Sequence, residues 1–81
     1  MGGLPPFAQG RNWYKRASKA IPRMNRKVWY DPDADFEYER EPNPTKHAWH
    51  QIDWRNRLYR DIDPDTGKPV AGSEGQWRPL K

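Results

Sequence analysis

Apolar side chains recur at near-helical spacing in two stretches of the chain. In the first stretch, Trp13, Ala17 and Ile21 follow one another at intervals of four residues, and Pro22 would end the run. A helix of about three turns is marginal in water on intrinsic propensity alone, so it needs a surface to lie on. The spacing therefore predicts a short helix over residues 11–21 that packs on another molecule.

The second stretch starts at Asn43 and Pro44, which suit the N-cap and the first position of a helix. Ile52 and Tyr59 lie at helical spacing, and neighbouring aromatic residues widen the apolar face. Several arginines near the end of the run would interact favourably with the helix dipole. This pattern predicts a second helix over residues 44–60.

The segment between the two predicted helices, residues 22–43, favours an extended chain. Residues 28–30 (Val-Trp-Tyr) are β-prone, and residues 31–33 (Asp-Pro-Asp) are typical of a turn. Residues 36–41 then alternate Phe, Tyr and Arg with Glu, which is the two-residue period of a strand. The pattern predicts an extended acidic segment that either pairs with the edge of a partner sheet or lies extended without pairing.

The composition offers little material for a hydrophobic core. Ile, Leu, Val and Phe together number ten of 81 residues, and the chain has nine prolines, six glycines and no cysteine. Below roughly 20% of such residues, disorder in isolation becomes the expectation. We therefore expect a single, mostly irregular or extended chain with two helices, without an autonomous core and ordered by its partners. An irregular arm over residues 1–10 and a turn with a tail over residues 61–81 would flank the helices.

Aromatic residues are plentiful by comparison, with five Trp, four Tyr and two Phe. Disordered linkers are poor in aromatic residues, whereas protein interfaces use Trp and Tyr as anchors. We expect the following residues to bind partner proteins: Trp13, Ile21, Trp29, Trp49, Trp54, Tyr59 and Trp77.

Charge is distributed in blocks along the chain. Residues 1–28 hold seven Lys or Arg and no acid, whereas residues 29–44 hold six acids and one Arg. The first block predicts binding to an acidic surface, which would be RNA, anionic lipid headgroups or acidic protein. Its basic residues are Arg11, Lys15, Arg16, Lys19, Arg23, Arg26 and Lys27. The acidic block argues against RNA wrapping along the whole chain, because it would repel phosphates.

Two groups of possible metal ligands are present, and neither predicts a metal site. Asp61, Asp63 and Asp65 alternate like the first ligands of a calcium loop, but the glycine comes one place late and the twelfth position is not Glu. His47 and His50 would share a helix face, yet no cysteine is present to complete a zinc site. A solvated acidic turn and ordinary polar contacts are the preferred interpretations.

Catalysis has little support in the sequence. No serine stands in a recognisable arrangement with a histidine and an acid, and no glycine-rich loop has the spacing that cradles a phosphate. A small chain that is poor in core residues also offers little scaffold for a substrate pocket. We therefore expect a protein without enzymatic activity, cofactor or small-molecule substrate.

Leu58-Tyr59-Arg60 resembles the tripeptide of the LYR family, whose members are small mitochondrial accessory subunits of respiratory complexes and iron–sulfur assembly factors. The resemblance covers three residues. In that family the tripeptide opens a three-helix bundle and a Phe follows downstream, whereas here proline-rich turns follow and no later Phe exists. No function is carried over from this resemblance.

The preferred function is structural. No stretch approaches the ~20 apolar residues of a membrane-spanning helix, and the basic, acid-free start resembles a mitochondrial import sequence that we expect to stay uncleaved. We expect an accessory subunit that joins several protein subunits of a mitochondrial respiratory-chain complex, peripheral to the inner membrane, with lipid headgroups as a further contact. One alternative is a ribosomal or mitochondrial-ribosomal protein whose basic arm binds RNA. A second alternative is a protein associated with microtubules or other filaments.

Overall fold

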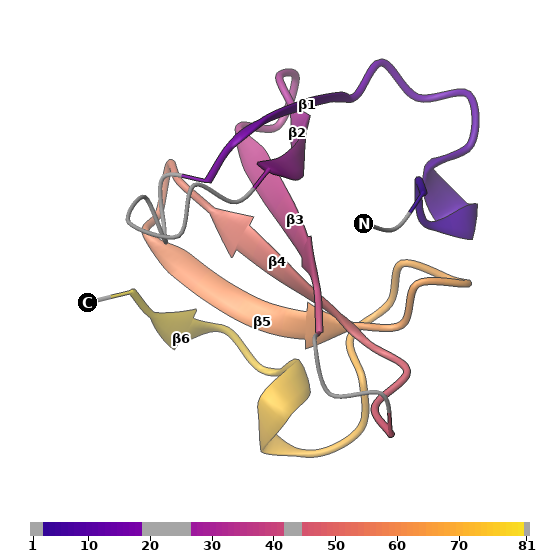
Figure 1. The fold of residues 1–81 in the computed structure, drawn as a ribbon. Coiled ribbons are helices and arrows are strands. Elements are labelled where there is room, and N and C mark those ends of the chain that lie inside the picture. The colour runs from indigo at the N-terminus through magenta and orange to yellow at the C-terminus, as the bar shows by residue number, and fades with distance from the viewer. Residues whose placement is uncertain (1–2, 19–26, 42–44, 81) are drawn as a thin grey trace.

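The structure, a computed structural model, describes residues 3–18, 27–41 and 45–80, and it shows one antiparallel sheet (Figure 1). Its six strands follow one another in chain order, each paired with the next. They are β1 (Tyr14–Ala17), β2 (Lys27–Asp31), β3 (Phe36–Arg40), β4 (Trp49–Asp53), β5 (Leu58–Ile62) and β6 (Arg78–Pro79). The helices in the described ranges are two short 3-10 turns, η1 (Pro6–Ala8) and η3 (Ser73–Gly75).

The sheet has two chemically different faces, because side chains alternate along each strand. On one face, which we call the aromatic face, the register places Trp29 beside Tyr38. On the other, which we call the charged face, Glu39 lies opposite His50 and His50 opposite Asp61. The aromatic face also carries Phe36, Trp49, Gln51, Arg60 and Ile62, and the charged face also carries Arg16, Tyr30, Glu37, Ile52 and Tyr59.

Three of the turns share one local design. An aspartate begins each turn, and a residue with positive φ follows four positions later: Asp31 with Asp35 (59°), Asp53 with Arg57 (57°), and Asp63 with Gly67 (76°). In each case the aspartate Oδ1 accepts the backbone N–H two residues further on, at 3.0, 3.0 and 2.8 Å. Such side-chain bonds to the nearby backbone stabilise turns against both helix and strand. The glycine in the third turn also gives the Phe7 ring room, since a Cβ there would lie 2.7 Å from it.

The core lies between the aromatic face and the N-terminal segment that crosses it. Trp13 stacks on Tyr38 with ring centroids 4.1 Å apart, and Phe7 meets these two rings edge-on at 5.4 and 5.8 Å. Ala8 and Ile62 are fully buried beside them. The Phe7 N–H donates to the carbonyl of Pro64 at 3.2 Å, which ties the segment to the turn after β5.

Both predicted helices are wrong. In the first stretch residues 14–17 form β1, and residues 19–21 lie outside the described residues. The second stretch forms β4, a turn and β5, apart from residue 44, which lies outside the described part. Ile52 and Tyr59, whose spacing suggested a helix, are instead cross-strand partners in neighbouring strands. The sheet prevails because Asp53 closes a turn in the middle of the stretch.

Residues 22–26 and 42–43 of the expected extended segment lie outside the described part, and most of the rest forms strands of the chain's own sheet. Residues 28–30 lie within β2, residues 31–33 begin a turn, and the alternating residues 36–40 form β3. β2 pairs with β1 and β3, and β3 also pairs with β4, so all the partners are strands of the same chain. The sequence suggested instead that this segment pairs with the sheet of another protein or stays unpaired.

The expectation of a chain without its own core is also wrong. The radius of gyration is 11.8 Å, and about 12 Å is expected for a folded domain of this length. Aromatic side chains explain the difference, because each buries roughly 150–250 Å² and so replaces more than one aliphatic residue. A count of Ile, Leu, Val and Phe therefore underestimates the material available here for a core.

Candidate functional site

Glu37, at the centre of the charged face, has a residue exposure of 0%. Its Oε2 accepts a hydrogen bond from Arg16 Nη2 at 2.9 Å, and its Oε1 accepts one from Ser18 Oγ at 3.0 Å. The Arg16 guanidinium lies over the Tyr30 ring at 3.6 Å from its centroid. A buried carboxylate requires such pairing, and the pair here joins β1 to β3 across β2.

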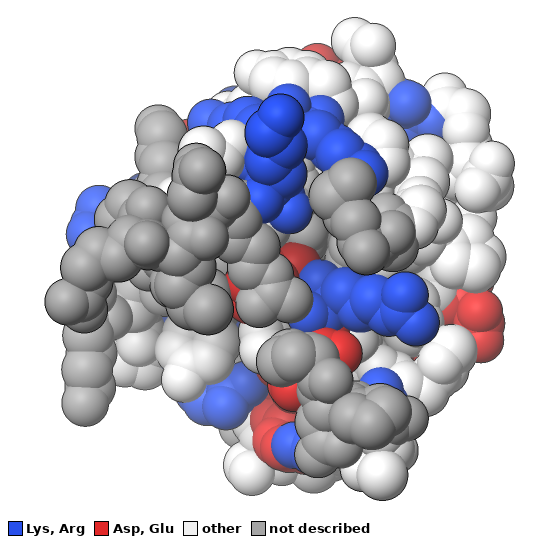
Figure 2. Space-filling view, in the orientation of Figure 1, with Lys and Arg blue, Asp and Glu red and all other residues white. Residues whose placement is uncertain are grey.

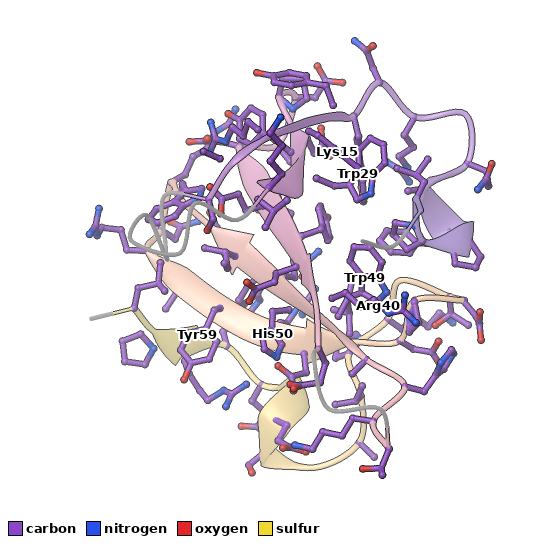
Figure 3. All side chains as sticks on the ribbon, viewed as in Figure 1. Lys15, Trp29, Arg40, Trp49, His50 and Tyr59 are labelled. Carbon is purple, nitrogen blue, oxygen red and sulfur yellow. The ribbon has the colours of Figure 1, made fainter. Side chains whose placement is uncertain are left out.

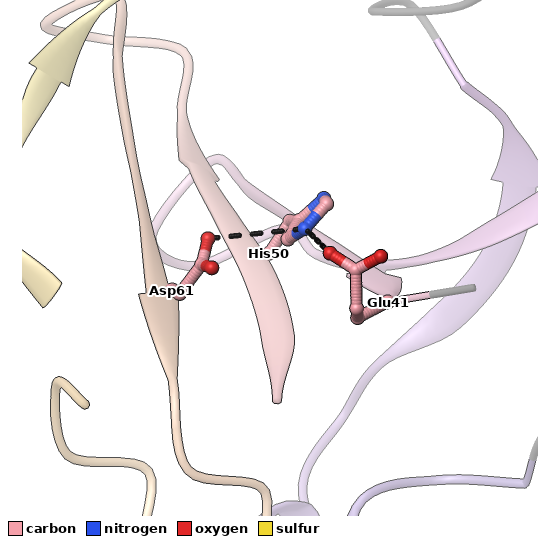
Figure 4. Close-up of side chains that lie close together, drawn as sticks. All are labelled: Glu41, His50 and Asp61. Atoms are coloured by element: carbon pink, nitrogen blue, oxygen red, sulfur yellow. Dashed lines mark hydrogen bonds and ion pairs between the residues drawn. The ribbon is translucent and has the colours of Figure 1, made fainter. Parts of the chain in front are cut away.

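His50 of β4 lies among carboxylates contributed by both neighbouring strands (Figure 4). Its Nδ1 is 3.3 Å from Glu39 Oε1, and its Nε2 is 2.7 Å from Glu41 Oε2 and 3.8 Å from Asp61 Oδ1. The hydrogen bond with Glu39 raises the pKa of His50 above 6.5, against the opposing effect of burial, and Glu41 and Asp61 raise it further. Arg78 of β6 approaches Asp61 at 3.4 Å and extends the network to the last strand.

Glu41, His50 and Asp61 also have the donor types of a metal centre. Their ligand atoms lie within 4.8 Å of one another, and the Glu39 bond to Nδ1 resembles the outer carboxylate of many metal-bound histidines. The same atoms already take part in the close contacts of the network, so a cation would have to compete with these contacts. We interpret the group as a charged network that joins four strands.

A second set, His47, Asp63 and Asp65, lies on exposed turns. His47 Nε2 is 2.9 Å from Asp65 Oδ2, with both side chains more than half exposed. The two histidines that the sequence placed on one helix face therefore belong to separate groups. The three alternating aspartates also divide, because Asp61 belongs to the charged network whereas Asp63 and Asp65 stay together beside His47.

The basic residues of the first charge block fall into different environments. Arg11 and Lys27 are exposed, Lys15 lies over the Trp29 ring at 5.1 Å, and Arg16 is paired with Glu37. Lys19, Arg23 and Arg26 lie outside the described residues. Figure 2 shows Lys and Arg side chains gathered over the region of β1. Their binding to an acidic surface stays a prediction.

The expected aromatic anchors also divide. Trp13 and Trp49 are 9% and 7% exposed and belong to the core, and Trp29 packs against it. Trp54 and Tyr59 are half-buried away from this cluster. Trp77 meets Phe36 at 6.1 Å and lies under Arg60 at 4.1 Å. Ile21 lies outside the described residues. Partner binding by these residues stays a prediction, and the half-buried ones are the accessible members.

The two outer strands of the sheet differ in length and character. β1 has four residues and, in the described ranges, pairs only with β2. β6 has two residues and ends in Pro79, which has no N–H to donate. Tyr14 in β1 is 50% exposed, and among the described residues no other large hydrophobic side chain is as exposed. An open edge of this kind is able to accept an additional strand.

Sequence reasoning assigned His50 only ordinary polar contacts, and it did not select Arg40 as a site residue. The signal was the alternation over residues 36–41, which sends Glu37 and Glu39 to one face of a strand and Arg40 to the other. The partner of Glu39 is His50 of β4, which also meets Asp61 of β5, and the helical interpretation of residues 44–60 concealed both strands.

The fold and these features define a small all-β protein, a six-stranded antiparallel meander with an aromatic core and a charged network. No protein-family model matches the chain, and no curated protein or solved structure matches it significantly. In the part of the chain that the structure describes, no helix has the length and apolar character needed to cross a membrane.

Proposed function

We propose that this protein is a non-catalytic structural subunit that attaches to an acidic surface of a larger protein assembly through strand β1. The observation that carries the proposal is the open edge of β1, which combines the half-exposed Tyr14 with nearby cations. Extended segments add to such edges through main-chain hydrogen bonds, while side chains on the strand set the preference for a partner.

The charges around β1 favour an acidic partner. Arg11, Lys15 and Lys27 surround the strand without an ion pair among the described residues, and no acid occurs in residues 1–28. Lysines on edge strands also discourage aggregation, and this role needs no partner. If these lysines bind a partner, reversing their charge should release the chain from its assembly. If they only prevent aggregation, reversing their charge should leave the assembly intact.

RNA binding is the competing proposal. Arg16 is engaged by Glu37, and the charged face would repel phosphates, so fewer cations are available than the sequence suggests. An RNA complex would weaken steeply with salt, because each neutralised phosphate releases a counterion. A mitochondrial respiratory-chain complex remains the proposed host, and a filament lattice remains a further proposal. The fold by itself gives no evidence for either host.

The test compares two double variants of the full chain with equal charge change. Lys15→Glu with Lys27→Glu alters the β1 region, and Arg55→Glu with Lys68→Glu alters exposed turn positions elsewhere. The wild type should sediment with a large assembly in extracts of the cells that produce it. The first variant should shift to the free fraction, whereas the second should remain with the assembly.

Carbodiimide cross-linking, which joins lysine to carboxylate, identifies the neighbour in the same experiment. Lys15 and Lys27 should cross-link to acidic segments of one protein partner. Equal loss of assembly in both variants, or a wild-type chain that sediments alone, would contradict the proposal. Release of the chain by ribonuclease would favour RNA instead. Denaturation midpoints of both variants establish that lost assembly is not lost folding.

A further inference from the structure

A cleft with a volume of about 270 Å³ opens where β3 ends and β4 begins, on the side of the aromatic face. One wall is the N-terminal segment with Leu4 and Pro5, and the floor includes Trp49. Figure 3 shows Arg40 and Trp49 side by side below that segment, in agreement with their pairing across the two strands. The cleft therefore has a mixed polar and apolar lining that includes a guanidinium group.

Cations outnumber acids around this cleft. Among the described residues that line it, Arg40 and Lys46 are the cations, His47 adds an imidazole, and Asp65 is the acid. The Asp65 carboxylate lies 2.9 Å from His47 Nε2, so it is engaged by His47 and not by Arg40. Lys46 reaches Glu74 at 2.9 Å through a pair that is about half exposed and therefore easily exchanged.

Arg40 is the unusual member of the group. Its guanidinium has no hydrogen bond, ion pair or ring contact within the described ranges of the chain. Its neighbours Glu39 and Glu41 cannot neutralise it, because strand alternation directs them to the charged face, where they bind His50. A guanidinium presents a planar fork of donors that matches a carboxylate or a phosphate group.

From these features we infer that the cleft binds a small organic anion, with its carboxylate or phosphate group on Arg40 and a short apolar body against Trp49 and Leu4. The volume lies just below the roughly 300–1,000 Å³ of typical ligand pockets, which favours a small ligand. The site is separate from β1, so it does not depend on the proposed function.

The experiment follows ligand titrations of the full-length chain by NMR, using the backbone amide of Arg40 and the indole N–H of Trp49. The probes are benzoate, phenyl phosphate and neutral benzyl alcohol. At least one anion should give saturable shifts at both groups by about 10 mM, since a Kd of 1 mM would be nearly saturated there. The anion that binds more tightly identifies the preferred charged group.

Variants separate a specific site from general attraction. Arg40→Gln should weaken anion binding about tenfold or more, because a hydrogen bond to a charged group is lost. Arg55→Gln, at an exposed turn, is the matched control and should bind like the wild type. Comparing the anions with benzyl alcohol on the wild-type chain keeps the test independent of how the variant folds. Absent shifts, equal binding of benzyl alcohol, or unchanged affinity in a folded Arg40→Gln variant would overturn the inference.

Discussion

The aromatic face of the sheet is closed by rings in contact with one another, whereas the charged face is closed by ion pairs and hydrogen bonds. On the aromatic face, Phe7, Trp13 and Tyr38 have ring centroids 4.1 to 5.8 Å apart. On the charged face, Glu37 and His50 hold their partners at 2.7 to 3.3 Å.

The two faces should therefore respond to different perturbations. Buried aromatic area stabilises the fold at any pH, and its loss leaves a cavity. Buried charges contribute little net stability as pairs, yet removing one partner leaves the other uncompensated. Truncation should therefore damage the aromatic face most, and neutralisation or a change of pH should affect the charged face most.

The largest effect is expected from Trp13→Ala. The change removes the ring stacked on Tyr38 and should lower the free energy of unfolding by about 3–5 kcal/mol. Urea denaturation followed by fluorescence measures it against a wild type that unfolds cooperatively. Trp54→Ala, in a turn outside the core, is the control and should cost at most about 1 kcal/mol. A wild type with no cooperative transition would contradict the autonomous core.

A smaller effect is expected from Glu37→Gln, which keeps the shape of the side chain and removes its charge. Arg16 would lose its carboxylate partner, and the free energy of unfolding should fall by about 1–3 kcal/mol. Chemical denaturation at neutral pH is the measurement. If Glu37→Gln has the same free energy of unfolding as the wild type, the Glu37–Arg16 pair does not stabilise the attachment of β1 to the sheet.

The next effect depends on pH and concerns His50. Its folded-state pKa lies above 6.5, so its contribution to stability is complete below pH 6.5 and is lost as the pH rises through the folded pKa. Urea midpoints from pH 5 to 9 should include this decline, and His50→Gln should remove it. His47→Gln, on an exposed turn, should preserve it. The same slope in the wild type and in His50→Gln would assign it to other groups.

The smallest effect is expected from the exposed pair between Lys46 and Glu74. Both side chains are about half in solvent, so Glu74→Gln should leave the denaturation midpoint unchanged within error. This variant is the matched partner of Glu37→Gln, since both replace a paired carboxylate by an amide. Equal destabilisation by the two variants would remove the distinction between buried and exposed charge.

The sequence by itself determined the features that depend on near neighbours. The alternation over residues 36–40 and the Asp-Pro-Asp turn at residues 31–33 appear in the structure as a strand and a turn. The same alternation implied that Glu37 and Arg40 would lie on opposite faces. Strand periodicity and turn chemistry act over a few residues, so they can be read without a fold.

Only the tertiary structure decided which residues meet across the sheet. Ile52 and Tyr59 fit a helix and a hairpin equally well by spacing, and their pairing resolved the choice. Trp13 serves as a core residue because Tyr38 lies opposite it, and His50 meets Asp61 because β4 pairs with β5. Burial and pKa values arise from neighbours distant in sequence, and local patterns of this chain do not specify those neighbours.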